Sequence, residues 1–477
     1  MTAYQSFKES LKNMRISVCG IGKNNTPVVL YLLAHGAAVW ACDRRSREKI
    51  GVNAEMLEKA GATLLLGEGY LDFPPVDMIL RTPGMKPYLP EFQKARENGI
   101  PVTSEMELFM AYCPVPMIGI TGSDGKTTTT AIMAGLLEAA GKKVFLGGNF
   151  GNPMLPMLEE ITEFASKMRL PSMSRPFSIA DVSDGIAVAE LSSFQLTGMT
   201  VSPSIAVVTN VAPNHLDWHT DMAEYIQAKS NLVRYQLPDS KTVLNADNSI
   251  TAGFAELANG EVSFFSRKKQ VVDGCYLKNG TIILSKNGEE WPVMPVSEIL
   301  LSGIHNVENY MAAIAAVRDM VPPEIIREFA RKFSGVAHRC EFVREWNGIS
   351  FYNDSIATSP TRTIAGLLSF DKKVILIAGG YDKHIPYDPL GIVASKTIKA
   401  AFLMGNTAPA IEQALNMSDK NIPCVHVTSM EQAVNLSVST AQAGDIVFMS
   451  PASASFDLYR DFEERGNHYK SIVNSLI

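Results

Sequence analysis

Residues 115–130 join an apolar, strand-like stretch to a glycine turn that ends in Gly-Lys-Thr, and a helix-compatible stretch, Ala131 to Ala140, follows. Successive backbone N–H groups at such a turn, together with the positive end of the helix, form a cradle for phosphate oxygens. In that cradle Lys126 would reach the terminal phosphates of a nucleoside triphosphate, and the Thr127 hydroxyl would ligate magnesium. The predicted nucleotide contacts are Gly122, Ser123, Asp124, Gly125, Lys126, Thr127 and Thr128.

This loop is shorter than the full eight-residue P-loop pattern. That pattern requires glycine at position 120, where the chain has Ile120, and the nearest glycines are Gly119 and Gly122. Short glycine loops also occur as ordinary turns, so the order of strand, turn and helix is what favours nucleotide binding.

A carboxylate and a histidine follow two other strand-like stretches. Glu190 comes directly after residues 185–189, where it would hold magnesium, because a hard cation prefers oxygen ligands. The alternative is a glutamate at a helix N-terminus, which the helix dipole favours. His215 and Asp217 follow the stretch 205–210, but a lone histidine is more often structural. No Cys/His spacing typical of zinc accompanies them.

Composition excludes several classes of protein. The net charge is -6 and no extended Lys/Arg field is present, which argues against nucleic-acid binding. The six cysteines are scattered without a C-x-x-C pair, so a zinc site or disulfide framework is not expected and a reducing compartment fits. The polar first fourteen residues lack a signal core, and no apolar stretch is long enough to span a bilayer. We therefore expect a cytoplasmic protein without membrane insertion.

The N-terminal region, residues 1–104, opens like a Rossmann unit. A strand over 16–22 and a helix-like segment precede a second strand that ends at Asp43, near Arg45. The dinucleotide fingerprint lacks its third glycine, because Asn25 stands there, so NAD is not favoured. A phosphate-bearing ligand that is not a dinucleotide fits better, although a plain structural turn is the alternative. Its candidate contacts are Asp43, Arg45 and two residues after the strand over 78–81, Thr82 and Gly84.

The length of 477 residues predicts about three domains. The central domain, 105–337, contains the glycine loop, further strands, and a small β portion with Asn-Gly turns over 241–296. Residues 159–185 show little periodicity and are interpreted as an excursion or long loop. The C-terminal domain, 338–477, alternates strands with helix-like stretches. The expected fold is α/β: two Rossmann-like domains flanking a P-loop ATPase with a mostly parallel sheet.

The motifs stand in an order that resembles the Mur ligase family, the amide-bond-forming enzymes of peptidoglycan precursor synthesis. The resemblance runs from Ile16 to the C-terminus. Its blocks are Gly119-Ile-Thr-Gly-Ser-Asp-Gly-Lys-Thr, Glu190-Leu-Ser-Ser-Phe-Gln-Leu, Asn214-His-Leu-Asp, Gly303-Ile-His-Asn-Val-Glu-Asn, His338-Arg-Cys-Glu, Asn353-Asp-Ser-x-Ala-Thr, Gly379-Gly-Tyr-Asp-Lys and Ser450-Pro-Ala-Ser-Ala-Ser-Phe-Asp. The second and last blocks favour the branch that adds D-glutamate.

The resemblance implies a UDP-binding N-terminal domain, a central ATPase and a mobile C-terminal domain. ATP would phosphorylate the carboxylate of UDP-N-acetylmuramoyl-L-alanine, and the amine of D-glutamate would attack the acyl phosphate. Such an enzyme serves cell-wall biogenesis, and thereby cell shape and division. Two magnesium ions are implied, and a monomer is expected.

The same resemblance implies roles for individual residues. Lys126 and Thr127 would hold phosphates and the first magnesium, with Glu190 as a ligand; His215 and a carbamylated Lys229 would bind the second. From its neighbours alone, Lys229 is merely a helix lysine. Asn309, Arg339 and Asp354 would hold the adenosine part and Asn149 would lie near the muramoyl-alanine, while Thr358, Lys383, Ser455 and Phe462 match the D-glutamate pocket.

One position departs from the family pattern. Where the family commonly has Asp-Ser-Lys-Ala-Thr, this chain has Ile356 in place of the lysine, so a positive charge near the amino-acid site is missing. We hypothesise that Arg362 partly compensates. Arg362→Ala should then raise the KM for D-glutamate, and an unchanged KM would contradict the idea.

Other functions stay open at this point. A sibling ligase would add meso-diaminopimelate or lysine, and a folylpolyglutamate synthetase would begin at the ATPase domain. A P-loop regulator would not need the C-terminal domain. A dehydrogenase on the N-terminal glycines should enhance NADH fluorescence.

Overall fold

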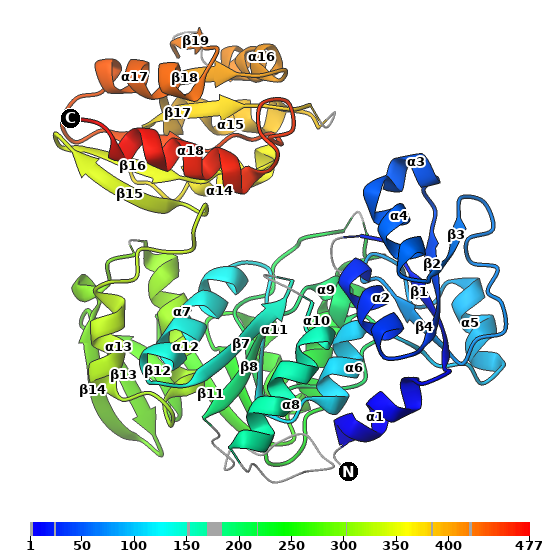
Figure 1. Cartoon of the computed structure of the whole chain (residues 1–477). Helices are drawn as coiled ribbons and strands as arrows, with labels where there is room; N and C mark the ends of the chain where they lie inside the picture. Colours follow the sequence, from blue (N-terminus) through cyan, green and yellow to red (C-terminus); the bar gives the residue numbers. More distant parts are fainter. Residues whose placement is uncertain are drawn as a thin grey trace. The chain divides into compact units, whose positions relative to one another are not determined.

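The structure is a computed structural model that describes residues 3–22, 25–149, 153–168, 184–216, 218–301, 303–382, 385–418 and 422–477. Its strands form three mostly parallel sheets, so the predicted α/β class is confirmed (Figure 1). The chain divides into two compact units: Met1–Leu300 with Ile304–Lys332, and Leu301–Gly303 with Phe333–Ile477. Among the described residues, no helix is long and apolar enough to cross a membrane.

The first sheet of unit 1 has five parallel strands in the order β3-β2-β1-β4-β5. The strands are β1 (Arg15–Cys19), β2 (Ala38–Asp43), β3 (Thr63–Leu66), β4 (Met78–Arg81) and β5 (Val102–Thr103). The helices are α1 (Ala3–Leu11), α2 (Asn25–Ala34), α3 (Arg47–Ile50), α4 (Val52–Lys59) and α5 (Pro90–Glu97). The strand order reverses between β1 and β4, and an open α/β sheet binds ligands at the carboxyl ends of the strands at such a point.

The second sheet of unit 1 has nine strands in the order β14-β13-β12-β11-β10-β9-β6-β8-β7. The strands are β6 (Met117–Thr121), β7 (Lys143–Gly148), β8 (Gly185–Glu190), β9 (Ile205–Val208), β10 (Lys241–Asn245), β11 (Glu261–Ser266), β12 (Gly274–Lys278), β13 (Thr281–Lys286) and β14 (Glu289–Pro295). Every residue of β6, β8 and β9 is buried, as expected for central strands covered on both faces. The pairings β12–β13 and β13–β14 are antiparallel and lie within the predicted β portion over 241–296, whereas β10, β11 and β12 pair in parallel.

The helices around this sheet are α6 (Glu105–Tyr112), α7 (Lys126–Ala139), α8 (Leu158–Lys167), α9 (Ser193–Leu196), α10 (Met222–Arg234), α11 (Ser249–Gly253), α12 (Ile304–Val317) and α13 (Pro323–Ala330). Helix α8 corrects the prediction of a loop excursion for residues 159–167. It is amphipathic, and it buries Leu158, Ile161 and Ala165 at helical spacing. Residues 169–183 of the predicted excursion lie outside the described residues.

Unit 2 contains a six-stranded sheet in the order β15-β16-β20-β17-β18-β19. The strands are β15 (Glu341–Trp346), β16 (Ile349–Asn353), β17 (Val374–Gly379), β18 (Ile398–Met404), β19 (Cys424–His426) and β20 (Ile446–Met449). The helices are α14 (Pro360–Leu367), α15 (Asp388–Thr397), α16 (Ala408–Ser418), α17 (Met430–Thr440) and α18 (Phe462–Asn474). The antiparallel hairpin β15–β16 was not predicted, although its turn residues Asn347 and Gly348 both have positive φ.

Candidate functional site

The predicted phosphate loop lies between β6, an interior strand of the nine-stranded sheet, and α7. Lys126, the first residue of α7, donates from Nζ to the carbonyl oxygens of Gly122 (2.9 Å) and Ser123 (2.8 Å). The hydroxyl of Ser123 donates to Ala212 O at 2.8 Å, and the backbone N–H of Asp124 donates to Asn210 Oδ1 at 3.0 Å. These bonds fix the loop against the segment that follows β9.

Two glycines of the loop cannot be replaced without strain. Gly122 has φ 153°, and a Cβ there would lie 1.9 Å from Thr209 Oγ1. Gly125 has φ 79°, and a Cβ there would lie 2.4 Å from Asn309 Oδ1. Asn309 on α12 also accepts a hydrogen bond from Thr129 Oγ1 at 3.1 Å. The structure therefore brings Asn309, predicted from the resemblance alone, to the glycine loop.

Lys229 lies beneath the same loop. Its side chain is 1% exposed, and its Nζ donates to Gly122 O at 2.7 Å and lies 4.7 Å from the centre of the Tyr225 ring. Burial, and then the nearby charge of Lys126, lower the pKa of Lys229 well below its ordinary value. A neutral amine is nucleophilic and can add carbon dioxide, whereas an ammonium cannot. The sequence around Lys229 gives no sign of this environment.

Glu190 is the last residue of β8, and α9 begins only at Ser193, so the helix N-terminus alternative is wrong. Its Oε1 accepts from Asn149 Nδ2 at 2.7 Å. Its Oε2 is buried and has no hydrogen-bond partner in the part of the chain that the structure describes. A buried, unpaired carboxylate oxygen is costly unless a ligand satisfies it. This oxygen, on the strand that pairs with β6 directly before the glycine loop, fits the chemistry of a magnesium ligand.

His215 is exposed and has a positive φ of 53°, and its ring centre lies 4.9 Å from that of Phe194. Asp217 lies outside the described residues. Across the described ranges, no group of three or more His, Cys, Asp or Glu side chains is gathered as a preformed metal site. A cation at the glycine loop would therefore need ligands of other types, such as the Thr127 hydroxyl.

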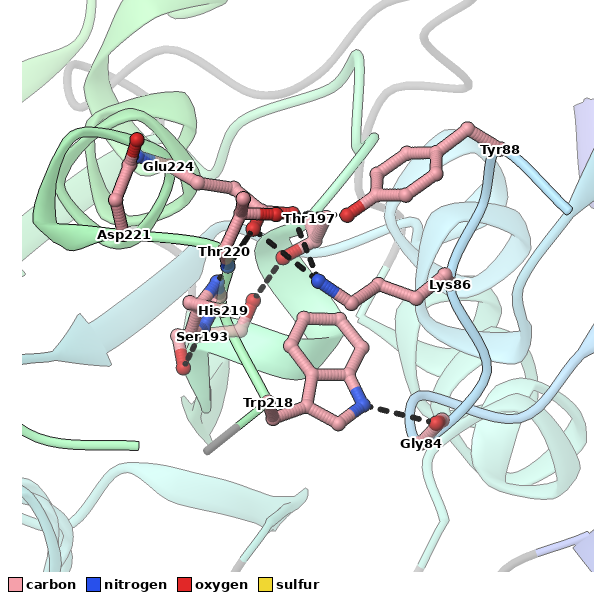
Figure 2. A network of polar contacts seen from close by, with 10 residues as sticks. All are labelled: Gly84, Lys86, Tyr88, Ser193, Thr197, Trp218, His219, Thr220, Asp221 and Glu224. Atoms are coloured by element: carbon pink, nitrogen blue, oxygen red, sulfur yellow. Dashed lines mark hydrogen bonds and ion pairs between the residues drawn. The ribbon is translucent and has the colours of Figure 1, made fainter. Parts of the chain in front are cut away.

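The residues beside His215 form a network that was not predicted from the sequence (Figure 2). His219 is 2% exposed, its Nε2 lies 3.0 Å from Ser193 Oγ, and burial lowers its pKa. Trp218 Nε1 donates to Gly84 O at 3.0 Å. Lys86 and Glu224 form an ion pair at 3.1 Å. These contacts join residues far apart in the sequence, so they could not be predicted from local patterns. The only local sign of the network was the aromatic pair Trp218-His219 after the histidine motif.

The candidate contacts of the first sheet meet at its carboxyl edge. Asp43 Oδ2 accepts from the backbone N–H of Ile21 at 2.7 Å, and Asp43 Oδ1 accepts from Arg45 Nε at 2.9 Å. Burial raises the pKa of Asp43, but hydrogen bonds from Arg45 and Ile21 outweigh burial and leave this pKa lowered. Gly20 faces Thr82, since a Cβ on Gly20 would lie 2.7 Å from Thr82 Cγ2. Asp43, Arg45 and Thr82 thus border the point where the strand order reverses.

In unit 2, Asp354 follows β16 and is buried, and burial raises its pKa to about 6. Its carboxylate accepts from Ser450 Oγ at 2.7 Å and from the backbone N–H of Cys340 at 3.1 Å. Arg339 precedes Cys340, and its Nε is buried without a hydrogen-bond partner among the residues described. The predicted adenosine contacts Arg339 and Asp354 are therefore neighbours in space.

In unit 2, hydrogen bonds join the segments that contain three of the predicted amino-acid contacts, Thr358, Ser455 and Phe462. Ser355 Oγ donates to the backbone oxygen of Phe462 at 2.7 Å. Arg465, 2% exposed, donates to Ser355 O at 2.9 Å and to Ala454 O at 3.1 Å. Arg465 therefore joins the segment of Thr358 to that of Ser455. Lys383 lies outside the described residues. Arg362 Nη1 donates to Ile356 O at 3.3 Å, which places Arg362 beside the departure from the family pattern.

The chain is similar to known proteins over nearly its whole length. Residues 120–317 match the Mur ligase middle domain, and residues 338–453 match the Mur ligase glutamate ligase domain. The chain is 47% identical over 482 residues to UDP-N-acetylmuramoylalanine–D-glutamate ligase of Acetivibrio thermocellus, covering 100% of this chain and 99% of that one. It is 46% identical to the enzyme of that name from Clostridium kluyveri, covering 99% of both chains.

Solved structures resemble the fold at low sequence identity. UDP-N-acetylmuramate–alanine ligase of Thermotoga maritima superposes with a TM-score of 0.54 at 18% identity, over 97% of this chain and 100% of that chain. A UDP-N-acetylmuramoyl-L-alanyl-D-glutamate–2,6-diaminopimelate ligase gives 0.53 at 17% identity, over 98% and 93%. At this identity the similarity is one of fold.

Proposed function

The chain belongs to the Mur ligase family of ATP-dependent ligases, and from this premise we propose that it joins D-glutamate to UDP-N-acetylmuramoyl-L-alanine. The observation that carries the proposal is the arrangement at the glycine loop. There a buried lysine of lowered pKa and an unpaired carboxylate oxygen border a strand–turn–helix phosphate cradle. The full-length relatives that carry the D-glutamate ligase name support the choice of amino acid.

The reaction needs two steps, because a free carboxylate is a poor electrophile. In the first, an oxygen of the donor carboxylate bonds to the γ-phosphorus of ATP, the bond to the bridging oxygen breaks, and ADP leaves. In the second, the amine of D-glutamate, having lost its ammonium proton, adds to the acyl carbon. Phosphate then leaves with its electron pair, and the nitrogen loses one more proton.

The residues of the loop suit the first step. Lys126 Nζ now bonds two loop carbonyls, and phosphate oxygens would replace them. Thr127, the Oε2 of Glu190, His215 and Lys229 as its carbamate would hold two magnesium ions. Magnesium supplies positive charge, which lets the anionic carboxylate approach the anionic phosphate. By the family resemblance Asn309 would contact the adenosine part, and it borders the loop at Gly125.

The substrate contacts extend the proposal to both ends of the chain. Asp43, Arg45, Thr82 and Gly84 would bind the UDP part of the donor, and Asn149 would lie near its muramoyl-alanine. Arg339 and Asp354 would complete the adenosine contacts. Thr358, Lys383, Ser455 and Phe462 would bind D-glutamate. We also infer a cytoplasmic monomer, divided at residues 1–104, 105–337 and 338–477.

ATP-dependent phosphate release with UDP-N-acetylmuramoyl-L-alanine tests the proposal. The reaction contains magnesium and bicarbonate, and D-glutamate is compared with L-glutamate, L-lysine and meso-diaminopimelate. We expect release that requires both the donor and D-glutamate. Turnover with another amino acid alone would keep the ligase chemistry and reject D-glutamate. The absence of turnover with every amino acid would reject the proposal.

A further inference from the structure

A segment of the first sheet is fastened to the nine-stranded sheet by four side chains, which we call the clasp: Lys86, Tyr88, Trp218 and Glu224 (Figure 2). Lys86 Nζ lies 3.1 Å from both carboxylate oxygens of Glu224, and the Tyr88 hydroxyl donates to Oε1 of the same carboxylate. Lys86 Nζ also lies 4.2 Å from the centre of the Trp218 ring, whose Nε1 donates to Gly84 O.

The clasp is more than a solvated surface ion pair. The side chains of Lys86 and Glu224 are 21% and 18% exposed, whereas those of the surface pair Lys332–Glu328 are 73% and 63% exposed. Burial raises the pKa of Glu224, but hydrogen bonds from Tyr88, Thr220 and Lys86 outweigh it and bring this pKa to about 2. The carboxylate thus stays ionised and bound to the clasp at any ordinary pH. Partly buried pairs are screened less by salt than exposed pairs.

One side of the clasp is the segment that follows β4. This segment begins with Thr82, which faces Gly20 across the point where the strand order reverses, and it continues through Gly84 to Tyr88. Arg81 also binds the segment, because its Nη1 donates to Met85 O at 3.2 Å. A ligand bound between β1 and β4 at the carboxyl edge of the first sheet would lie beside the start of this segment.

The other side of the clasp leads to the candidate reaction centre. Glu224 lies on α10, the helix that carries Lys229. The ring centre of Trp218 lies 4.8 Å from that of Phe194, which in turn lies 4.9 Å from that of His215. Phe194 belongs to the short helix α9 after Glu190. The clasp therefore contacts α10, which carries Lys229, and the segment that carries His215, so it reaches two of the four candidate catalytic residues.

We propose that Lys86 and Glu224 are positioning residues for the acyl donor. Their ion pair holds the segment after β4 at a fixed position against α10, so that a donor bound at the first sheet presents its carboxylate to the glycine loop. This rests on the proposed function, since it takes the donor to be UDP-N-acetylmuramoyl-L-alanine. A fixed segment spares the donor the entropy of ordering that segment and preserves the near-attack geometry, on which reaction rates depend steeply. Neither residue touches the reacting atoms.

The test compares Lys86→Met and Glu224→Gln with the matched surface control Lys332→Met, which also removes an ion pair. Donor affinity is measured by calorimetric titration without ATP, ATP affinity is measured separately, and steady-state kinetics give the KM of each substrate. In both clasp variants we expect the Kd and KM for the donor to rise about tenfold, which corresponds to about 1.4 kcal/mol. The affinity for ATP and the KM for D-glutamate should change less than about twofold. General damage to the fold would instead weaken the binding of all three substrates.

A charge exchange guards against variants that fail to fold. Lys86→Glu combined with Glu224→Lys restores a pair of opposite charges. Donor affinity of this double variant should therefore exceed that of Lys86→Glu alone and of Glu224→Lys alone. Unchanged donor affinity in folded Lys86→Met, or an equal loss of donor and ATP affinity, would overturn the proposal. Failure of the proposed function is a separate result, because wild-type protein would then not bind the donor or not turn it over with D-glutamate.

Discussion

Lys126 and Lys229 both donate to the carbonyl oxygen of Gly122, yet their surroundings give them different chemistry. Lys126 begins a helix at a phosphate cradle, where a permanent positive charge is useful. Lys229 is buried beside that charge, which adds to burial in lowering the pKa of Lys229. Of the two lysines at this loop, Lys229 therefore loses its proton more readily than an exposed lysine does.

The first prediction tests the lowered pKa of Lys229. In the unfolded chain Lys229 is protonated at any pH below the ordinary pKa of lysine. In the folded chain it is protonated only at much lower pH, so protonation of Lys229 favours unfolding. Lys229→Met should therefore keep or raise the melting temperature at pH 7 and flatten the rise of stability as pH increases towards the ordinary pKa of lysine. Its ligase activity should fall by about 100-fold or more. Lys229→Arg should lose both stability and activity, because arginine cannot become neutral. A melting temperature equal to wild type for Lys229→Arg would contradict the account.

The second prediction concerns Asp354, whose pKa burial raises to about 6. In the unfolded chain this carboxyl ionises at lower pH, so Asp354 makes stability fall as pH rises from about 4 to 6. Asp354→Asn should remove that fall, so that its melting temperature relative to wild type increases over this range. It should also weaken ATP binding if the carboxylate holds the ribose. Thermal unfolding at several pH values and nucleotide titration check both, and a parallel pH profile for the two proteins would disprove the burial argument.

At the scale of elements, the tight turn between β6 and α7 sets the shape of the phosphate loop. Gly125→Ala should cost about 1–3 kcal/mol of stability, because φ is positive there and the added methyl group would meet Asn309. Gly253→Ala is the matched control, since Gly253 ends α11 and nothing lies within 4 Å of its added Cβ. That control should be neutral or stabilising by up to about 1 kcal/mol. Denaturant unfolding and ATP affinity distinguish the two, and equal effects would refute the steric argument.

The elements around the glycine loop could be predicted because each one has a local signal. The strand before Gly122, the helix after it and the strand that ends at Glu190 follow from apolar runs and turn residues. The hairpin β15–β16 was missed because Glu341–Trp346 is a half-buried edge strand without a continuous apolar run. Helix α8 was missed because the unperiodic residues that follow it obscured its amphipathic pattern.

The site was predictable only where a local pattern matched known chemistry. Lys229 was found through the resemblance, because its burial arises from the packing of α10 against a loop about one hundred residues earlier in the chain. The clasp was not found at all, since Lys86 and Glu224 are separated by 138 positions. A single sequence carries no signal that pairs such distant charges. The unpaired Oε2 of Glu190 likewise required coordinates.

At the scale of the molecule, each unit buries apolar clusters of its own. In unit 1 one hydrophobic cluster continues from α1 and β1 of the first sheet through α6 to the strands of the nine-stranded sheet. The two sheets of unit 1 therefore share a core, which agrees with the clasp that joins them. Unit 2 has separate clusters that contain Leu376 and Ile377, neighbours on β17 whose side chains point to opposite faces of its sheet.

The last prediction follows from the fact that unit 1 and unit 2 have separate hydrophobic cores. Calorimetry of the ligand-free protein should show two transitions, because each unit buries its own apolar surface. Leu376→Ala in β17 and Leu244→Ala in β10 form a matched pair, as both leucines are completely buried. Each change should cost about 2–5 kcal/mol and lower one transition by roughly 5–15 °C, leaving the other in place. A fragment of residues 333–477 should unfold near the transition that Leu376→Ala moves. If both substitutions lowered one shared transition, the units would unfold together and the division of the core would be wrong.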